Sequence, residues 1–169
     1  VILFLVFATT VVKAQNMPLS YAFGEKYNDR YKYSNLMAMT SDGSGGYLLV
    51  RAYYTGLILK PKGYFIERYD KDLALLSEYN FKIKDVDFAD AFVSNGQLNL
   101  LFLQYNQGSQ SYDYVVHRSP VDVMGFTPKT ILSIPSVMVD SPLDKNYYNQ
   151  NFNSGFTTAV LFNKDKSAF

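Results

Sequence analysis

The sequence repeats one local pattern three times: a polar turn followed by an apolar run that favours a β-strand. The three copies are Ser41-Asp42-Gly43 before residues 47–50, Ser94-Asn95-Gly96 before 98–103, and Asn153-Ser154-Gly155 before 156–162. They lie about 50 to 60 residues apart, a period typical of stacked four-stranded sheets such as propeller blades. This repetition constrains the fold more than any other feature of the chain.

The runs between these turns predict four strands in each complete repeat. We expect strands at 36–40, 47–54, 64–69 and 73–81, and again at 87–93, 98–105, 112–118 and 130–134, where Ser119-Pro120 ends the third strand. Asn95-Gly96 is a strong hairpin signal. A helical turn over 86–92 is the alternative there, but no stretch sustains a helical period.

The predicted fold is therefore all-β, with consecutive four-stranded antiparallel meanders. It corresponds to a truncated β-propeller of about two and a half blades, at approximately 34–83, 84–136 and an incomplete 137–169. Residues 15–33 are a Tyr-rich lead-in segment.

The first residues predict export. Residues 1–12 are mostly apolar, and Val12 and Ala14 suit the −3 and −1 positions of a signal-peptidase site, so we interpret 1–14 as a truncated signal peptide. The alternatives are an N-terminal core strand or a short anchor. The run is too short for a membrane-spanning helix, which needs about 20 apolar residues. We expect release into the periplasm, the cell surface or the medium, and a chain that continues beyond residue 169.

Composition excludes several classes of function. The chain has no cysteine, so we expect neither an N-terminal lipoprotein nor a cysteine-zinc site. Sixteen basic residues face 15 acidic ones without a basic block, which argues against nucleic acid as a partner. The 15 Tyr and 13 Phe suit half-buried β-sheet surfaces.

Two segments resemble the units of a known class of repeat protein. Residues 41–50 (SDGSGGYLLV) and 64–73 (YFIERYDKDL) are similar to the repeats of exported bacterial β-propeller proteins, which are common among secreted proteins of the Bacteroidota. The resemblance covers roughly residues 34–169. It implies an architecture and no single activity.

One acidic cluster is a candidate metal site. Asp85, Asp87 and Asp90 form a D-x-D-x-x-D pattern, and carboxylates are preferred ligands of Ca²⁺. Calcium is therefore the one possible cofactor. The alternative is a solvated link between two repeats, because the pattern lacks the glycine and the bidentate glutamate of an EF-hand loop.

The sequence offers no complete catalytic constellation. His117 is the only histidine, and no Gly-x-Ser-x-Gly elbow accompanies it, so we interpret it as structural. Thr40-Ser41-Asp42-Gly43 is similar to the start of a sialidase Asp-box but lacks the later Gly-x-Thr-Trp, and Asp-Gly is also ordinary turn chemistry. A pair of glycosidase carboxylates across a cleft cannot be chosen from the acids present.

Two tyrosine pairs, Tyr53-Tyr54 and Tyr147-Tyr148, are candidates for stacking on sugar rings, with core packing as the alternative. We predict an exported, non-catalytic domain of the cell envelope that binds a protein or a glycan. The alternative is a fragment of an exported glycan hydrolase or lyase. Strand alternation should place the segments 55–63, 85–90, 106–110 and 140–146 together on one rim, where a ligand would bind.

Overall fold

Eight antiparallel strands in two four-stranded sheets make up the described part of the chain. The computed structural model describes residues 33–54, 61–138, 161, 163 and 164. Sheet A contains β1 (Tyr33–Ser41), β2 (Tyr47–Tyr54), β3 (Gly63–Tyr69) and β4 (Leu75–Phe81). Sheet B contains β5 (Val86–Ser94), β6 (Gln97–Asn106), β7 (Ser111–Pro120) and β8 (Thr127–Pro135).

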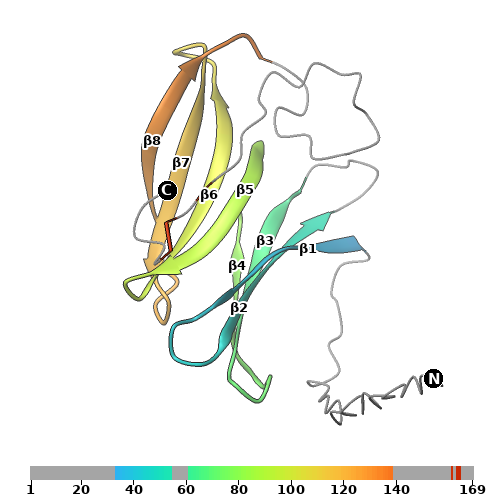
Figure 1. The fold of residues 1–169 in the computed structure, drawn as a ribbon. Coiled ribbons are helices and arrows are strands. Elements are labelled where there is room, and N and C mark those ends of the chain that lie inside the picture. Colours follow the sequence, from blue (N-terminus) through green and yellow to red (C-terminus); the bar gives the residue numbers. More distant parts are fainter. Residues whose placement is uncertain (1–32, 55–60, 139–160, 162, 165–169) are drawn as a thin grey trace, which may run out of the picture.

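Both sheets are meanders, because their strand orders follow the sequence, β1-β2-β3-β4 and β5-β6-β7-β8 (Figure 1). This confirms the predicted all-β class and the two four-stranded repeats. Within the described residues, no helix is long and apolar enough to cross a membrane. The predicted signal peptide and almost all of the lead-in segment and the third repeat lie outside the described residues.

The strands are longer than predicted at several ends. The expected break at Ser119-Pro120 is wrong, since β7 continues through both residues and Pro120 pairs with Gln97. Proline has no backbone N–H to donate, and it is tolerated there because it is the last residue of the strand, where the ladder of hydrogen bonds ends. The hairpin at Asn95-Gly96 is confirmed: both residues have positive φ, 51° and 70°, as a two-residue turn requires.

Each sheet has one bulge in its first strand and one in its fourth. The register shifts between Leu36 and Ala38 in β1, and between Phe88 and Asp90 in β5. It shifts again where β4 and β8 pair with β3 and β7. Because β-bulges are specific features of a backbone, their recurrence shows that the two sheets share more than a strand count.

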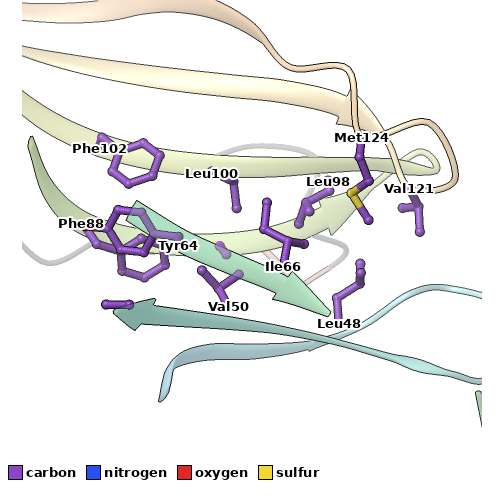
Figure 2. Close-up of a cluster of buried hydrophobic side chains, with 12 residues drawn as sticks. Leu48, Val50, Tyr64, Ile66, Phe88, Leu98, Leu100, Phe102, Val121 and Met124 are labelled. Carbon is purple, nitrogen blue, oxygen red and sulfur yellow. The ribbon is translucent and has the colours of Figure 1, made fainter. Parts of the chain in front are cut away.

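The two sheets pack face to face through one apolar core, which we call the seam (Figure 2). Sheet A contributes alternate residues of β2 and β3, and sheet B contributes residues of β5 and β6. The fully buried members are Leu48, Val50, Ala52, Tyr64 and Ile66 from sheet A, and Leu98, Leu100 and Phe102 from sheet B. The Phe102 ring lies 5.2 Å from that of Tyr64 and 5.6 Å from that of Phe88. The seam is therefore an ordinary close-packed core.

The faces that point away from the seam differ between the sheets. The outer face of sheet B carries a second apolar cluster, formed by Leu101, Leu103, Tyr112, Tyr114 and Val116. The outer face of sheet A instead carries an ion pair between Arg51 and Glu67, whose side chains are 13% and 2% exposed. The Arg51 guanidinium also lies over the Phe65 ring, 5.6 Å from its centroid.

The strand registers give an equivalence between the two repeats. Val50 pairs with Ile66 in sheet A as Leu101 pairs with Val116 in sheet B. Continuing along the strands, Ala52 and Tyr64 correspond to Leu103 and Tyr114. The outer face of sheet B is thus the counterpart of the face of sheet A that forms the seam.

Candidate functional site

The ends of the strands form two opposite rims that carry all the connecting segments. The turn rim carries the β1–β2, β3–β4, β5–β6 and β7–β8 turns, and the link rim carries the β2–β3 and β6–β7 loops and the β4–β5 link (Figure 1). As predicted, the described residues of 55–63 and 106–110 lie at the link rim, and the segment 85–90 starts there and continues into β5. Residues 140–146 lie outside the described residues.

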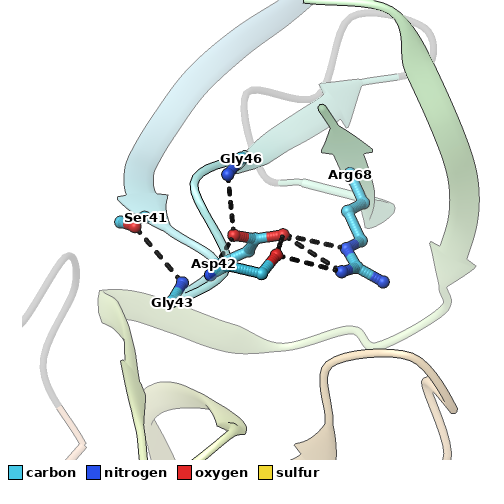
Figure 3. Close-up of polar contacts among 6 residues, drawn as sticks. Ser41, Asp42, Gly43, Gly46 and Arg68 are labelled. Atoms are coloured by element: carbon cyan, nitrogen blue, oxygen red, sulfur yellow. Dashed lines mark hydrogen bonds and ion pairs between the residues drawn. The ribbon is translucent and has the colours of Figure 1, made fainter. Parts of the chain in front are cut away.

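At the turn rim, Asp42 organises the β1–β2 turn (Figure 3). Its Oδ1 accepts hydrogen bonds from the backbone N–H groups of Ser44 at 2.8 Å and Gly46 at 2.9 Å. Its Oδ2 accepts one from the Ser44 hydroxyl at 2.7 Å and two from the Arg68 guanidinium at 3.1 Å. Burial alone would raise the pKa of Asp42, but these donors outweigh it and lower the pKa to about 2.

The Asp42 carboxylate therefore has a structural role in this turn. Every oxygen of the carboxylate is used within the turn or by Arg68. A side chain at Gly46 would place its Cβ 2.3 Å from the Tyr69 carbonyl oxygen, so the close approach of the two chains requires glycine. This agrees with the interpretation of Asp-Gly as turn chemistry.

Sheet B has an arginine at the position equivalent to Arg68, but its partner differs. Leu48 pairs with Arg68 in sheet A, and Asn99 pairs with Arg118 in sheet B. The Arg118 Nε–H donates to Asn99 Oδ1 at 2.8 Å. Asn99 is itself buried and donates to the Gln97 carbonyl at 3.0 Å, which fixes its orientation. A neutral amide thus holds Arg118, whereas a carboxylate holds Arg68.

At the link rim, the loop between β6 and β7 is anchored by Asp113. Asn106 Nδ2 donates to its carboxylate at 3.2 Å, and the Ser111 hydroxyl donates at 2.9 Å. A hydrogen bond from the Ser133 hydroxyl is the main cause that lowers the pKa of Asp113, and burial opposes it. Residues 106–110 are all exposed. The loop is thus a polar, exposed segment on a fixed base.

The three aspartates proposed for calcium are not gathered into a cluster. Asp85 is exposed at the β4–β5 link, Asp87 pairs with Leu103, and Asp90 pairs with Leu101 beyond the bulge. Asp90 Oδ1 accepts a hydrogen bond from the Ala91 N–H at 2.8 Å. In the described part of the chain, no group of three His, Cys, Asp or Glu side chains is suited to hold a metal ion. Calcium binding by these residues stays an untested prediction.

The described tyrosine pair is packed within the protein. Tyr53 is 4% exposed, lies 4.8 Å from the Phe65 ring and donates its hydroxyl proton to Asn80 Oδ1 at 2.9 Å. Tyr54 is half-buried against the seam. Core packing accounts for Tyr53, while Tyr54 keeps part of its surface exposed, and stacking of a sugar on this pair stays an untested prediction. Tyr147 and Tyr148 lie outside the described residues.

His117 is half-buried and contacts aromatic side chains. Its ring lies edge-on to Phe81 at 5.2 Å and to Phe102 at 5.5 Å, and burial lowers its pKa. These apolar contacts are consistent with a neutral, structural histidine.

Sequence reasoning did not single out two polar arrangements that the structure shows. These are the buried pair Arg51–Glu67 and the pair Arg118–Asn99. Tyr69 donates its hydroxyl proton to Glu67 at 3.1 Å, and burial followed by the charge of Glu67 raises the pKa of Tyr69 to about 12. An alignment of the two repeats, strand by strand, would have pointed to both pairs. It shows a polar residue in one repeat where the other has an apolar one, as with Arg51 and Phe102 or Asn99 and Leu48.

Comparison with known protein families, with curated proteins and with solved structures gave no match to this chain. Any function must therefore be argued from the geometry of the chain itself.

Proposed function

We propose that this chain is part of an exported β-propeller that binds a glycan or a protein of the cell envelope without turning it over. The observation that carries the proposal is the pair of equivalent meanders packed face to face. Such repeats give a rigid scaffold whose rims display loops, and loops on rigid scaffolds commonly carry recognition.

The propeller architecture is supported by the outer face of sheet B. Four of its apolar residues, Leu101, Leu103, Tyr114 and Val116, stand where the face of sheet A that sheet B covers has Val50, Ala52, Tyr64 and Ile66. Nearer the turn rim, Asn99 stands where sheet A has Leu48. A repeat protein buries each such face against the next repeat. We propose that a third blade, from the chain after Pro135, follows sheet B in the way that sheet B follows sheet A.

Binding is favoured over catalysis by how the buried acids are used. Asp42, Glu67 and Asp113 are each buried, and each accepts hydrogen bonds from side chains that hold a turn, an ion pair or a loop. A catalytic acid or base needs a free path to a substrate atom. These three carboxylates serve the scaffold instead.

Export is supported by the apolar residues 1–12 and the residues that follow them. We propose cleavage after Ala14. N-terminal sequencing of the secreted full-length protein tests this, and a mature chain that retains residues 1–14 would refute cleavage.

Affinity electrophoresis tests binding without turnover. The secreted protein would be run through native gels containing dextran, polygalacturonate or dextran sulfate, and the same mixtures assayed for new reducing ends. We expect retardation by at least one polysaccharide and no new reducing ends. Release of reducing ends would identify an enzyme, and absence of retardation in all gels would remove polysaccharides of these kinds as ligands.

A further inference from the structure

The two equivalent arginines of the turn rim differ in charge balance. Arg68 forms an ion pair with Asp42 at 3.1 Å, and its side chain is 23% exposed. Arg118 is exposed, and its one hydrogen bond to a described residue goes from Nε to the neutral Asn99 amide. Among the residues that the structure describes, the ion pairs are Arg51–Glu67, Arg68–Asp42 and Lys71–Asp72. The positive charge of Arg118 is therefore not compensated by any of these carboxylates.

A second cation lies beside Arg118 on the same face, the outer face of sheet B, near its turn-rim edge. A third blade packed there would leave both side chains accessible, as sheet B leaves the equivalent Arg68 23% and Tyr79 38% exposed in sheet A. Val116 pairs with Lys129 and Arg118 pairs with Thr127, so Lys129 is a diagonal neighbour of Arg118 across β7 and β8. Diagonal neighbours on one face lie about 7 to 8 Å apart, within reach of long side chains. Lys129 is exposed. The acid nearest in sequence, Asp122 in the β7–β8 loop, is exposed and forms no ion pair with either cation among the described residues.

The way Arg118 is held suits it to bind an oxyanion. Asn99 accepts a hydrogen bond only from the Nε–H of Arg118. The two terminal nitrogens of this exposed guanidinium therefore stay available to a ligand. A guanidinium presents its N–H groups in a planar fork that matches carboxylate, sulfate or phosphate oxygens. Because the buried Asn99 fixes one edge of the group, less side-chain freedom is lost on binding.

We propose that Arg118, positioned by Asn99 and assisted by Lys129, is an oxyanion-binding point on the turn rim that recognises the carboxylate or sulfate groups of an acidic polysaccharide. The inference rests on the proposed binding function and names the class of glycan. Sheet A lacks such a point, because the equivalent arginine, Arg68, already forms an ion pair with Asp42.

The test compares binding to charged and neutral polymers. The full-length secreted protein would be titrated with polygalacturonate, dextran sulfate and neutral dextran, and retardation in affinity gels would give the apparent dissociation constants. We expect binding to a polyanion that weakens as NaCl is raised, since salt screens exposed charges. Polygalacturonate and dextran sulfate separate a carboxylate ligand from a sulfate ligand.

Three variants and one control locate the site. Arg118→Gln should weaken polyanion binding about tenfold or more, the loss expected for a charge-assisted hydrogen-bond pair. Lys129→Gln should weaken it by about two- to fivefold, the effect of an exposed charge. Lys84→Gln removes one exposed charge at the link rim and should leave binding unchanged. Thermal melts of each variant report whether the fold is retained.

Asn99→Asp is the sharpest variant, because it gives Arg118 the carboxylate that Arg68 already has. It keeps the guanidinium and should still weaken polyanion binding about as much as Arg118→Gln. The inference is overturned if Arg118→Gln binds like the wild type, if Lys84→Gln loses as much affinity, or if neither polyanion binds. Binding to neutral dextran alone, unchanged in the Arg118 variant, would overturn it and leave the proposed binding function standing.

Discussion

Sheets A and B have the same strand order and the same bulges, but their outer faces differ in character: that of sheet B is apolar and that of sheet A carries an ion pair. Both are four-stranded meanders with bulges in the first and fourth strands. Yet the positions occupied by Arg51 and Glu67 in sheet A are occupied by Phe102 and His117 in sheet B, where they face the seam. The repeat therefore fixes the path of the chain, while a few substitutions decide what each face can pack against.

This difference indicates that the two ends of the stack are not interchangeable. The outer face of sheet B is apolar and matches a seam surface. The outer face of sheet A buries charge, and a buried charge is tolerated only with its partner in place. The partners of this ion pair, Ser34 and Tyr69, come from sheet A itself, so the two outer faces suit different neighbours.

The largest effect is expected from breaking the ion pair on sheet A. Among the described residues, Arg51→Met leaves the buried Glu67 carboxylate with only the Tyr69 hydroxyl as a partner, and it should lower the free energy of unfolding by about 3 to 5 kcal/mol. Urea unfolding monitored by tyrosine fluorescence measures it. The double variant Arg51→Met/Glu67→Leu is the control and should recover most of the loss, because no buried charge is then unpaired. An unchanged stability in Arg51→Met would show that Glu67 is solvated.

The matched pair Leu100→Ala and Leu101→Ala compares the seam with the outer face of sheet B. The residues are neighbours in β6 and are 0% and 1% exposed. Truncating a fully buried leucine costs about 2 to 5 kcal/mol, so both variants should lose a similar amount. A much smaller loss in Leu101→Ala would contradict the proposal that a further sheet covers that face as sheet B covers sheet A.

Asp42→Asn tests the turn that only sheet A has in this form. The pKa of Asp42 falls from 3.8 to about 2 on folding, which corresponds to roughly 2 kcal/mol of stability. Because the folded-state pKa is the lower one, this contribution is present above about pH 4 and is lost as the pH falls through 2. We expect the variant to be about 2 kcal/mol less stable at pH 7.

The difference between wild type and Asp42→Asn should shrink at pH 2, where the wild-type carboxyl is also becoming uncharged. Urea unfolding of both proteins at the two pH values measures this. A difference that stays constant with pH would assign the effect to turn geometry rather than to the Arg68 charge.

The smallest effect should be a gain in stability, from removing the hydroxyl of Tyr64. The Tyr64 hydroxyl is buried in the seam, and it is the buried side-chain polar atom that has no hydrogen-bond partner among the described residues. Burial is the main cause that raises the pKa of Tyr64 well above its usual value. Tyr64→Phe removes an unsatisfied group and should stabilise the fold by about 1 kcal/mol.

Tyr53→Phe is the control for Tyr64→Phe. It removes a hydroxyl that donates to Asn80, and should cost about 1 kcal/mol. Thermal melts of both variants suffice for the comparison. A loss of stability in Tyr64→Phe would mean that the hydroxyl finds a partner in solution.

The sequence by itself determined the all-β class, the two four-stranded repeats and most strand positions. It could do so because alternating apolar residues and turn signals such as Asn95-Gly96 act locally, through backbone preference and the two-residue period of a strand. It also favoured the structural interpretations of Asp42 and His117, since neither came with the partners that catalysis needs.

The tertiary structure decided which side chains meet. The aspartates 85, 87 and 90 look like a cluster in the sequence, but in the described part of the chain they do not come together as a group of three that could hold a metal ion. Tyr53 and Tyr54 look alike in the sequence, but Tyr53 is buried against Phe65 and hydrogen-bonded to Asn80, whereas Tyr54 is half-buried against the seam. The pairs Arg51–Glu67 and Arg118–Asn99 join residues on different strands, which only the register brings together. Contacts of this kind depend on register and on sheet packing, and local sequence encodes neither.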